Sequence, residues 1–105
     1  MRKKGLTEKQ IQILQTLNNK GQIKRYASIL AYMIKHKNPE TGKFEMSLYR
    51  LEQKYNAITQ RATLGTLKNA AKKFVELDLL TLEKIDGKNI YTFKYTEKGN
   101  NNENL

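Results

Sequence analysis

Apolar residues recur at helical spacing along the first part of the chain. After Thr7 they fall at positions 11, 14 and 17. Thr7 and Gln10 have the spacing of a capping box, in which each side chain bonds the backbone amide of the other residue. This pattern predicts a first helix that begins at Thr7 and ends at residues 18–21, where asparagine and glycine suit a left-handed cap.

A second helix is expected over residues 22–36. Ile29 and Tyr32 widen its apolar stripe to one side. Two explanations are open: a broad face buried inside the chain, which we favour, or a contact with a second subunit. The stripe itself consists of Ile23, Tyr26, Ala27, Leu30, Met33 and Ile34.

The pattern changes after a predicted turn at residues 38–42, where Pro39 and Gly42 break the helix. Residues 43–46 alternate and predict one short strand. Ser47 caps a short helix that ends in a tight turn at residues 56–58, and Thr59 caps a longer helix that reaches Leu77. The expected inward side chains are Leu48, Leu51 and Tyr55 in the short helix, and Leu64, Leu67, Ala71, Phe74 and Val75 in the longer one.

The remainder of the domain predicts a β-hairpin. Residues 79–85 and 90–95 flank a turn at residues 86–89, and its Asp-Gly pair is a strong turn signal because both residues tolerate positive φ. Two registers are open, since a two-residue turn places Leu80 opposite Phe93 and a four-residue turn places it opposite Tyr95. In both registers Leu80, Leu82, Tyr91, Phe93 and Tyr95 form an apolar face toward the core, and Glu83, Thr92 and Lys94 face solvent.

Length, charge and cysteine content narrow the class of protein. The 105 residues suit one domain, which we expect over residues 7–97, between a basic arm at 1–6 and a disordered tail at 98–105. The formal net charge of +10 attracts polyanions, either nucleic acid or an anionic membrane surface. The sequence has no cysteine and no apolar run long enough to cross a bilayer. We therefore expect a cytoplasmic protein that does not associate with membranes.

The predicted order of helix, helix, strand, helix, helix, strand and strand resembles the winged helix-turn-helix family. The residues that carry the resemblance are Met46-Ser47-Leu48-Tyr49-Arg50-Leu51, Ile58-Thr59-Gln60-Arg61-Ala62-Thr63-Leu64 and Phe74-Val75-Glu76-Leu77-Asp78-Leu79-Leu80. They are similar to the opening of the family's helix-turn-helix, the start of its recognition helix and its exit into the wing. Asp78 stands where the family has a glycine, and the longer helix exceeds the common length by about one turn.

Within this family, residues 20–80 are most similar to small DNA-binding proteins of plasmid replication and transfer in Gram-positive bacteria, such as the relaxosome accessory proteins of clostridial conjugative plasmids. The resemblance implies a mainly α-helical domain with a small β-hairpin that binds double-stranded DNA. It implies three partners: duplex DNA, a second copy in a homodimer, and other plasmid transfer or replication proteins.

The helix from Thr59 is the expected reader of the DNA, because the major groove admits one α-helix and displays a full donor and acceptor code. Arg61 suits guanine or, equally, a phosphate, and Gln60 or Asn69 suits adenine. We expect Lys68 and Lys72 to contact phosphates or to form a solvated face. The predicted contacts on this helix are Thr59, Gln60, Arg61, Thr63, Lys68, Asn69 and Lys72.

The tip of the hairpin is the second expected contact, through Lys84, Gly87, Lys88 and Asn89. Because the reading helix is rich in alanine, we expect this wing to carry at least as much sequence recognition, by entering the minor groove or a bent duplex. Phosphate contacts by the two lysines are the alternative.

No catalytic role, metal or cofactor is expected. The sequence has no glycine-rich phosphate loop and no metal-ligand spacing, and its single histidine, His36, lies near a predicted helix end, where a cation is favoured. Three alternatives to a plasmid accessory factor stay open: a transcription regulator, a protein-interaction module on the same scaffold, and a binder of RNA or single strands.

Overall fold

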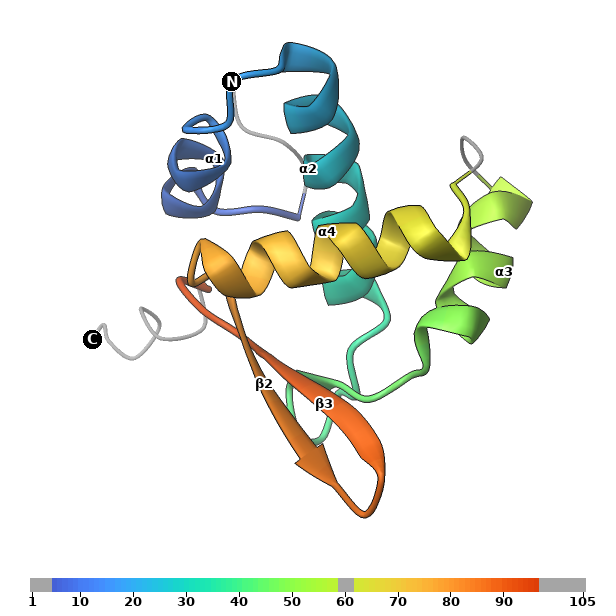
Figure 1. Cartoon of the computed structure of the whole chain (residues 1–105). Coiled ribbons are helices and arrows are strands. Elements are labelled where there is room, and N and C mark those ends of the chain that lie inside the picture. The colour runs from blue at the N-terminus through green and yellow to red at the C-terminus, as the bar shows by residue number, and fades with distance from the viewer. Residues whose placement is uncertain (1–4, 59–61, 97–105) are drawn as a thin grey trace.

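The computed structural model describes residues 5–58 and 62–96, and within them the chain is mainly helical with a three-stranded antiparallel sheet (Figure 1). The elements follow the predicted order. They are α1 (Glu8–Leu14), α2 (Lys20–Lys35), β1 (Lys43–Phe44), α3 (Leu48–Ile58), α4 (Leu64–Glu76), β2 (Leu80–Ile85) and β3 (Lys88–Phe93). In Figure 1, α4 crosses α2, with α3 near the N-terminal end of α4 and the hairpin leaving from its C-terminal end. No helix in the described part is long and apolar enough to cross a membrane.

The capping box at the start of α1 is confirmed. The backbone amide of Gln10 donates to Thr7 Oγ1 at 3.2 Å, and that of Thr7 donates to Gln10 Oε1 at 2.9 Å. The Gln10 side chain also donates to the carbonyl of Lys94 at 2.9 Å, so it ties α1 to the end of the sheet. Leu6, the last residue of the predicted arm, is buried in the core. Residues 1–4 of that arm and 97–105, which hold the predicted tail, lie outside the described residues.

The predicted end of the first helix was wrong. α1 ends at Leu14, and Asn19 caps the start of α2 by accepting a hydrogen bond from the amide of Gln22 at 3.0 Å. An asparagine at this position satisfies one of the helix amides that have no intrahelical partner. Gly21 therefore lies in the first turn of α2 and not in a left-handed cap.

The boundary between α3 and α4 also differs from the prediction. α3 continues through Ile58, and α4 begins at Leu64 with Thr63 as its cap, so the prediction that Thr59 caps the helix was wrong. The side chain of Asn56 explains this boundary. It accepts from the amide of Ala62 at 2.7 Å and donates to the carbonyl of Ala62 at 2.9 Å, which occupies both backbone groups of a buried residue.

The hairpin has the register of the two-residue turn, with Leu80 opposite Phe93. Asp86 and Gly87 have φ of 51° and 79°, as a tight hairpin turn requires. β1 covers only Lys43 and Phe44 and pairs with β3, which gives the strand order β1-β3-β2.

The core lies between the helices and one face of the sheet. Its fully buried large side chains include Phe44, Phe74, Leu14, Ile29, Leu30, Met33, Leu51, Leu67, Leu79 and Leu80. The widened side of α2 is used inside the chain, as favoured: Ile29 is buried, and the Tyr32 hydroxyl donates to the carbonyl of Lys54 at 3.0 Å.

Three predicted inward positions were wrong. Val75 is 37% exposed, Leu82 is 47% exposed and Tyr95 is 39% exposed. Ala70 is buried in α4 in addition to Ala71, which turns Val75 outward. Leu82 lies on the correct face of the hairpin, but the hairpin extends beyond the end of the core.

Candidate nucleic-acid interface

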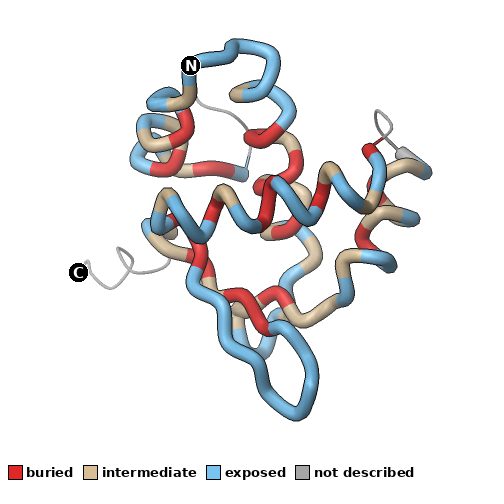
Figure 2. The backbone as a smooth tube through the Cα atoms, viewed as in Figure 1, coloured by how far each residue is buried: buried red, intermediate tan, exposed pale blue. Residues whose placement is uncertain are grey.

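The outer face of α4 carries three of the predicted contacts. Lys68, Asn69 and Lys72 are exposed, and with Gly65 they follow the spacing of one helical face (Figure 2). Within the described residues, neither of these lysines lies within ion-pair distance of a carboxylate, whereas Lys73 pairs with Glu76 at 3.1 Å. The two lysines therefore present their charge to solvent.

The opposite face of α4 holds this surface in place. Leu67, Ala70, Ala71 and Phe74 are buried, and the Phe74 ring meets Tyr26 of α2 edge to face with 5.7 Å between centroids. The two alanines allow α4 to pack closely on its neighbours, because they place no bulk between the helices. The exposed face is thus rigidly oriented by a separate apolar face.

Of the remaining predicted residues of the reading helix, Thr63 alone belongs to the described part of the chain. Thr63 is exposed, but its hydroxyl accepts from the amide of Thr66 at 3.0 Å and caps α4. Thr59, Gln60 and Arg61 lie outside the described residues. Within the described residues, the structure therefore brings Lys68, Asn69 and Lys72 together on the outer face of α4, with Thr63 exposed at its start.

The hairpin tip is exposed throughout, and it projects away from the helices (Figures 1 and 2). Lys84, Lys88 and Asn89 all lie there, and Gly87 in the turn has open space around the position of a side chain. The predicted wing residues are therefore accessible to a large ligand.

A Schellman motif joins α4 to the hairpin. The amide of Leu79 donates to the carbonyl of Phe74 at 2.8 Å, and the amide of Asp78 donates to that of Val75 at 3.0 Å. Asp78 adopts φ of 63°, so it takes the left-handed conformation in which a glycine is usual. Leu79 and Phe74 are both buried, as this motif favours, and they set the direction in which the hairpin leaves α4.

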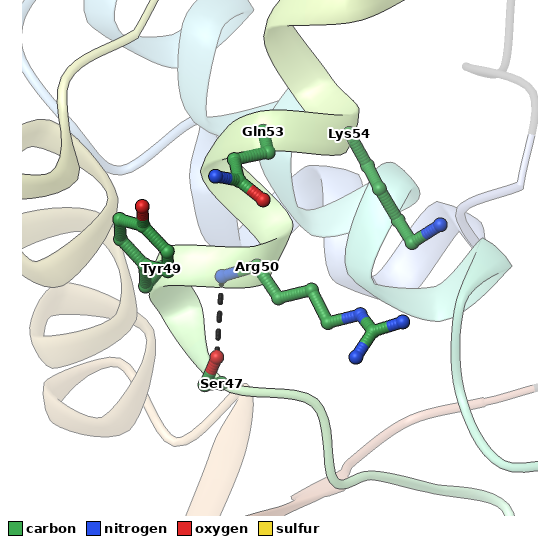
Figure 3. Close-up of a pocket in the computed structure, with 5 residues that line it drawn as sticks. All are labelled: Ser47, Tyr49, Arg50, Gln53 and Lys54. Carbon is green, nitrogen blue, oxygen red and sulfur yellow. Dashed lines mark hydrogen bonds between the residues drawn. The ribbon is translucent and has the colours of Figure 1, made fainter.

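The outer face of α3 contains a shallow pocket that the sequence analysis did not single out (Figure 3). Arg50 and Lys54 extend to the same side of the helix, and Tyr49 is 59% exposed. The exposure of these residues could have been predicted from the sequence, because they lie outside the apolar stripe of the predicted helix. The lining residues are Ser47, Tyr49, Arg50, Gln53 and Lys54, a set that suits an anion.

His36 directly follows α2, at a helix end that favours a cation. Its Nε2 atom is buried and has no hydrogen-bond partner among the described residues, and its ring lies 4.6 Å from that of Tyr32. Burial lowers the pKa of His36, and the nearby charges of Lys54 and Lys35 lower it further. Both effects act against a charge on this imidazole, in the opposite direction to the helix end.

No protein-family model, no curated protein and no solved structure matches the chain. A functional assignment therefore depends on the charge, exposure and arrangement of the residues described above. Among those residues, no group of three His, Cys, Asp or Glu side chains is placed to hold a metal ion.

Proposed function

We propose that this protein is a winged helix-turn-helix protein that binds double-stranded DNA sequence-specifically and without enzymatic activity. The observation that carries the proposal is the exposed cationic face of α4, formed by Lys68, Asn69 and Lys72. In this proposal α3 and α4 form the helix-turn-helix and the β2–β3 hairpin is the wing. The net charge of +10 supports a polyanionic ligand.

The proposed binding mode places α4 in the major groove. Asn69 offers the amide that pairs with an adenine edge, and Lys68 and Lys72 offer charge to the flanking phosphates. Gln60 and Arg61 precede α4 in the chain and keep the base or phosphate contacts expected from the sequence. Because Ala70 and Ala71 are buried, α4 has few outward groups, and the wing supplies the remaining recognition.

Two observations weigh against the other classes of partner. The outer face of α4 is polar, with Val75 exposed only at its far end, whereas a protein-interaction module would present an apolar face there. Tyr91 and Phe93 are buried, so they are not available as stacking platforms for single-stranded nucleic acid. Duplex DNA is the ligand that fits the exposed groups best.

The proposed biological setting is an accessory factor that binds an origin of plasmid transfer or replication in the cytoplasm. A transcription regulator uses the same DNA contacts and is the alternative setting. If the DNA site consists of two half-sites, we propose that the protein binds it as a homodimer.

Selection of bound duplexes from a random pool tests the proposal. We expect a consensus sequence, and a palindrome within it would indicate a symmetric dimer. The matched variants are Lys68→Ala/Lys72→Ala on α4 and Lys20→Ala/Lys24→Ala on α2. Each pair removes two exposed charges at a spacing of four, so the α4 pair should weaken binding to the selected consensus much more than the α2 pair does. An unenriched pool, or equal losses in both pairs, would contradict the proposal.

A further inference from the structure

Three cationic side chains gather where the C-terminal end of α2 meets α3. Arg50 and Lys54 are one turn apart on α3 and extend to the same side of it (Figure 3). Lys35 is the last residue of α2, and its Nζ atom lies 5.6 Å from the centroid of the Tyr32 ring. The Tyr32 hydroxyl donates to the carbonyl of Lys54 at 3.0 Å, which ties the two helices together at this point. Lys35, Arg50 and Lys54 form the α2–α3 basic cluster.

The positive charge of this cluster has no counter-charge in the described part of the chain. None of its three members lies within ion-pair distance of a carboxylate there. Glu52 stands between the two α3 members in the sequence, but residues two apart on a helix do not face each other. The carboxylate of Glu45 accepts from Asn38 Nδ2 at 3.4 Å and from Thr41 Oγ1 at 2.8 Å. The cluster therefore attracts anions from solution.

His36 lies beside the cluster and responds to its charge. Burial lowers the pKa of His36 most, and the charges of Lys54 and Lys35 lower it further, so both lysines act on the same imidazole. Arg50 is not among the groups that shift this pKa. An anion held by the two lysines would offset their charge, and the imidazole would then accept a proton more readily.

The cluster lies on the side of α3 that faces α2. Asn56, which contacts Ala62 just before α4, is two residues beyond Lys54 and hence about 200° further around the helix. Tyr49 likewise points to a different side of α3 from Arg50 and Lys54 (Figure 3). The cluster is therefore distinct from the cationic face of α4.

From this arrangement we infer that the α2–α3 basic cluster binds a phosphate group. The planar fork of Arg50 matches two oxygens of a phosphate, and Lys54 and Lys35 supply two further charges. Ser47 and Gln53 line the same shallow pocket as Arg50 and offer neutral donors. The phosphate belongs either to a small phosphorylated ligand or to a nucleic-acid backbone. The inference goes beyond the proposed function and does not depend on it.

A sulfate titration followed by NMR tests the inference, with chloride at the same ionic strength as the reference. Sulfate is tetrahedral and stays dianionic over the range in which histidine titrates. We expect saturable shifts of the backbone amides of residues 47–54 and a rise in the pKa of His36, which is the single histidine of the chain. Shifts that do not saturate would overturn the inference. Saturable shifts without a rise in this pKa would also overturn it, because the lysines beside His36 would then not hold the anion.

Arg50→Ala and Arg25→Ala are the matched variants. Each removes one exposed arginine, and Arg25 lies on α2 about 15 Å along the helix from Lys35. Arg50→Ala should weaken sulfate binding by about tenfold, since a hydrogen-bonded charge is lost, and Arg25→Ala should leave it unchanged. Equal affinities in the two variants would refute the site. Thermal unfolding checks that both variants fold, which is expected at exposed positions.

A short duplex of random sequence distinguishes the two sources of the phosphate, with fluorescence anisotropy as the measurement. If Arg50→Ala weakens duplex binding several-fold more than Arg25→Ala does, the phosphate belongs to a nucleic-acid backbone. If the two variants bind the duplex equally while only Arg50→Ala loses sulfate, the site serves a small phosphorylated ligand. Failure of the sulfate titration leaves the proposed function intact, since variants of α4 test that function.

Discussion

The carboxylate of Asp78 lies 3.3 Å from the ammonium group of Lys94, which links the residue after the C-cap of α4 to the residue after β3. Tyr95 donates its hydroxyl to the same carboxylate at 3.3 Å. Asp78 also has the left-handed backbone that ends α4, with φ of 63°. One side chain therefore stands at the junction from which both proposed DNA-contacting elements extend.

Replacing Asp78 separates its backbone role from its side-chain role. Asp78→Gly should stay within about 1 kcal/mol of the wild type, because the ion pair is largely exposed and contributes little. Asp78→Ala should be less stable than Asp78→Gly by about 1 kcal/mol, because only glycine adopts the left-handed conformation without cost. Urea unfolding measures both. At Glu76, which is helical, the order of alanine and glycine should be reversed. Equal stability of the two Asp78 variants would contradict the backbone argument.

The side chain of Asn56 should be required for the boundary between α3 and α4. Asn56→Ala leaves the amide and the carbonyl of Ala62 without their partners, which we expect to cost about 1–3 kcal/mol in the free energy of unfolding. Asn56→Asp keeps an acceptor for the amide but places a carboxylate beside the carbonyl, so its stability should also be reduced. The exposed neighbour Gln53 provides the control, since Gln53→Ala should change stability little. A fully stable Asn56→Ala would remove this explanation of where α4 begins.

Gly65 should be replaceable by alanine without harm to the fold. A Cβ atom there has only Thr63 Oγ1 nearby, at 3.7 Å, and the gain in helix propensity is up to about 1 kcal/mol. Gly21 occupies the corresponding position of α2, but a Cβ atom there lies 3.3 Å from the capping atom of Asn19. We therefore expect Gly65→Ala to raise the melting temperature more than Gly21→Ala does. The reverse order would show that the cap of α2 tolerates the contact.

Protonation of His36 should destabilise the protein. Because its pKa is lower in the folded state than the ordinary value of about 6.5, the unfolded chain binds more protons as the pH falls below that value. Stability should be fully present above pH ~6.5 and decrease as the pH is lowered toward the folded-state pKa. Urea unfolding at pH ~7.5 and ~5.5 measures the decrease, and His36→Gln should reduce it, since carboxylates titrate mostly below this range. An equal decrease in the variant would assign the pH dependence to other groups.

The salt dependence of DNA binding should report the number of phosphates contacted. If about six are neutralised, log affinity against log salt concentration should have a slope near −5. Lys72→Ala should make this slope less negative by about one, because it removes one of those contacts. Titrations at several salt concentrations give the slope, and binding that hardly depends on salt would count against an electrostatic complex.

Local sequence patterns were enough to predict the number, order and type of the elements, the capping box of α1 and the two candidate registers of the hairpin. These features depend on local physics: helical or alternating periodicity, hydrogen bonds over three residues, and the positive φ that Asp86 and Gly87 tolerate. The exposed positions of α4 were also predictable, since Lys68 and Lys72 lie opposite its apolar stripe.

Tertiary packing set where α4 begins and how far the core extends. The contact of Asn56 with Ala62 moved the start of α4, and the end of the core left Leu82 exposed on its predicted face. Packing also buried the His36 ring near Lys54 of α3, and burial and the nearby lysines lower its pKa. Periodicity shows which side of an element is apolar, but how much of that side is covered depends on packing between segments that are distant in sequence.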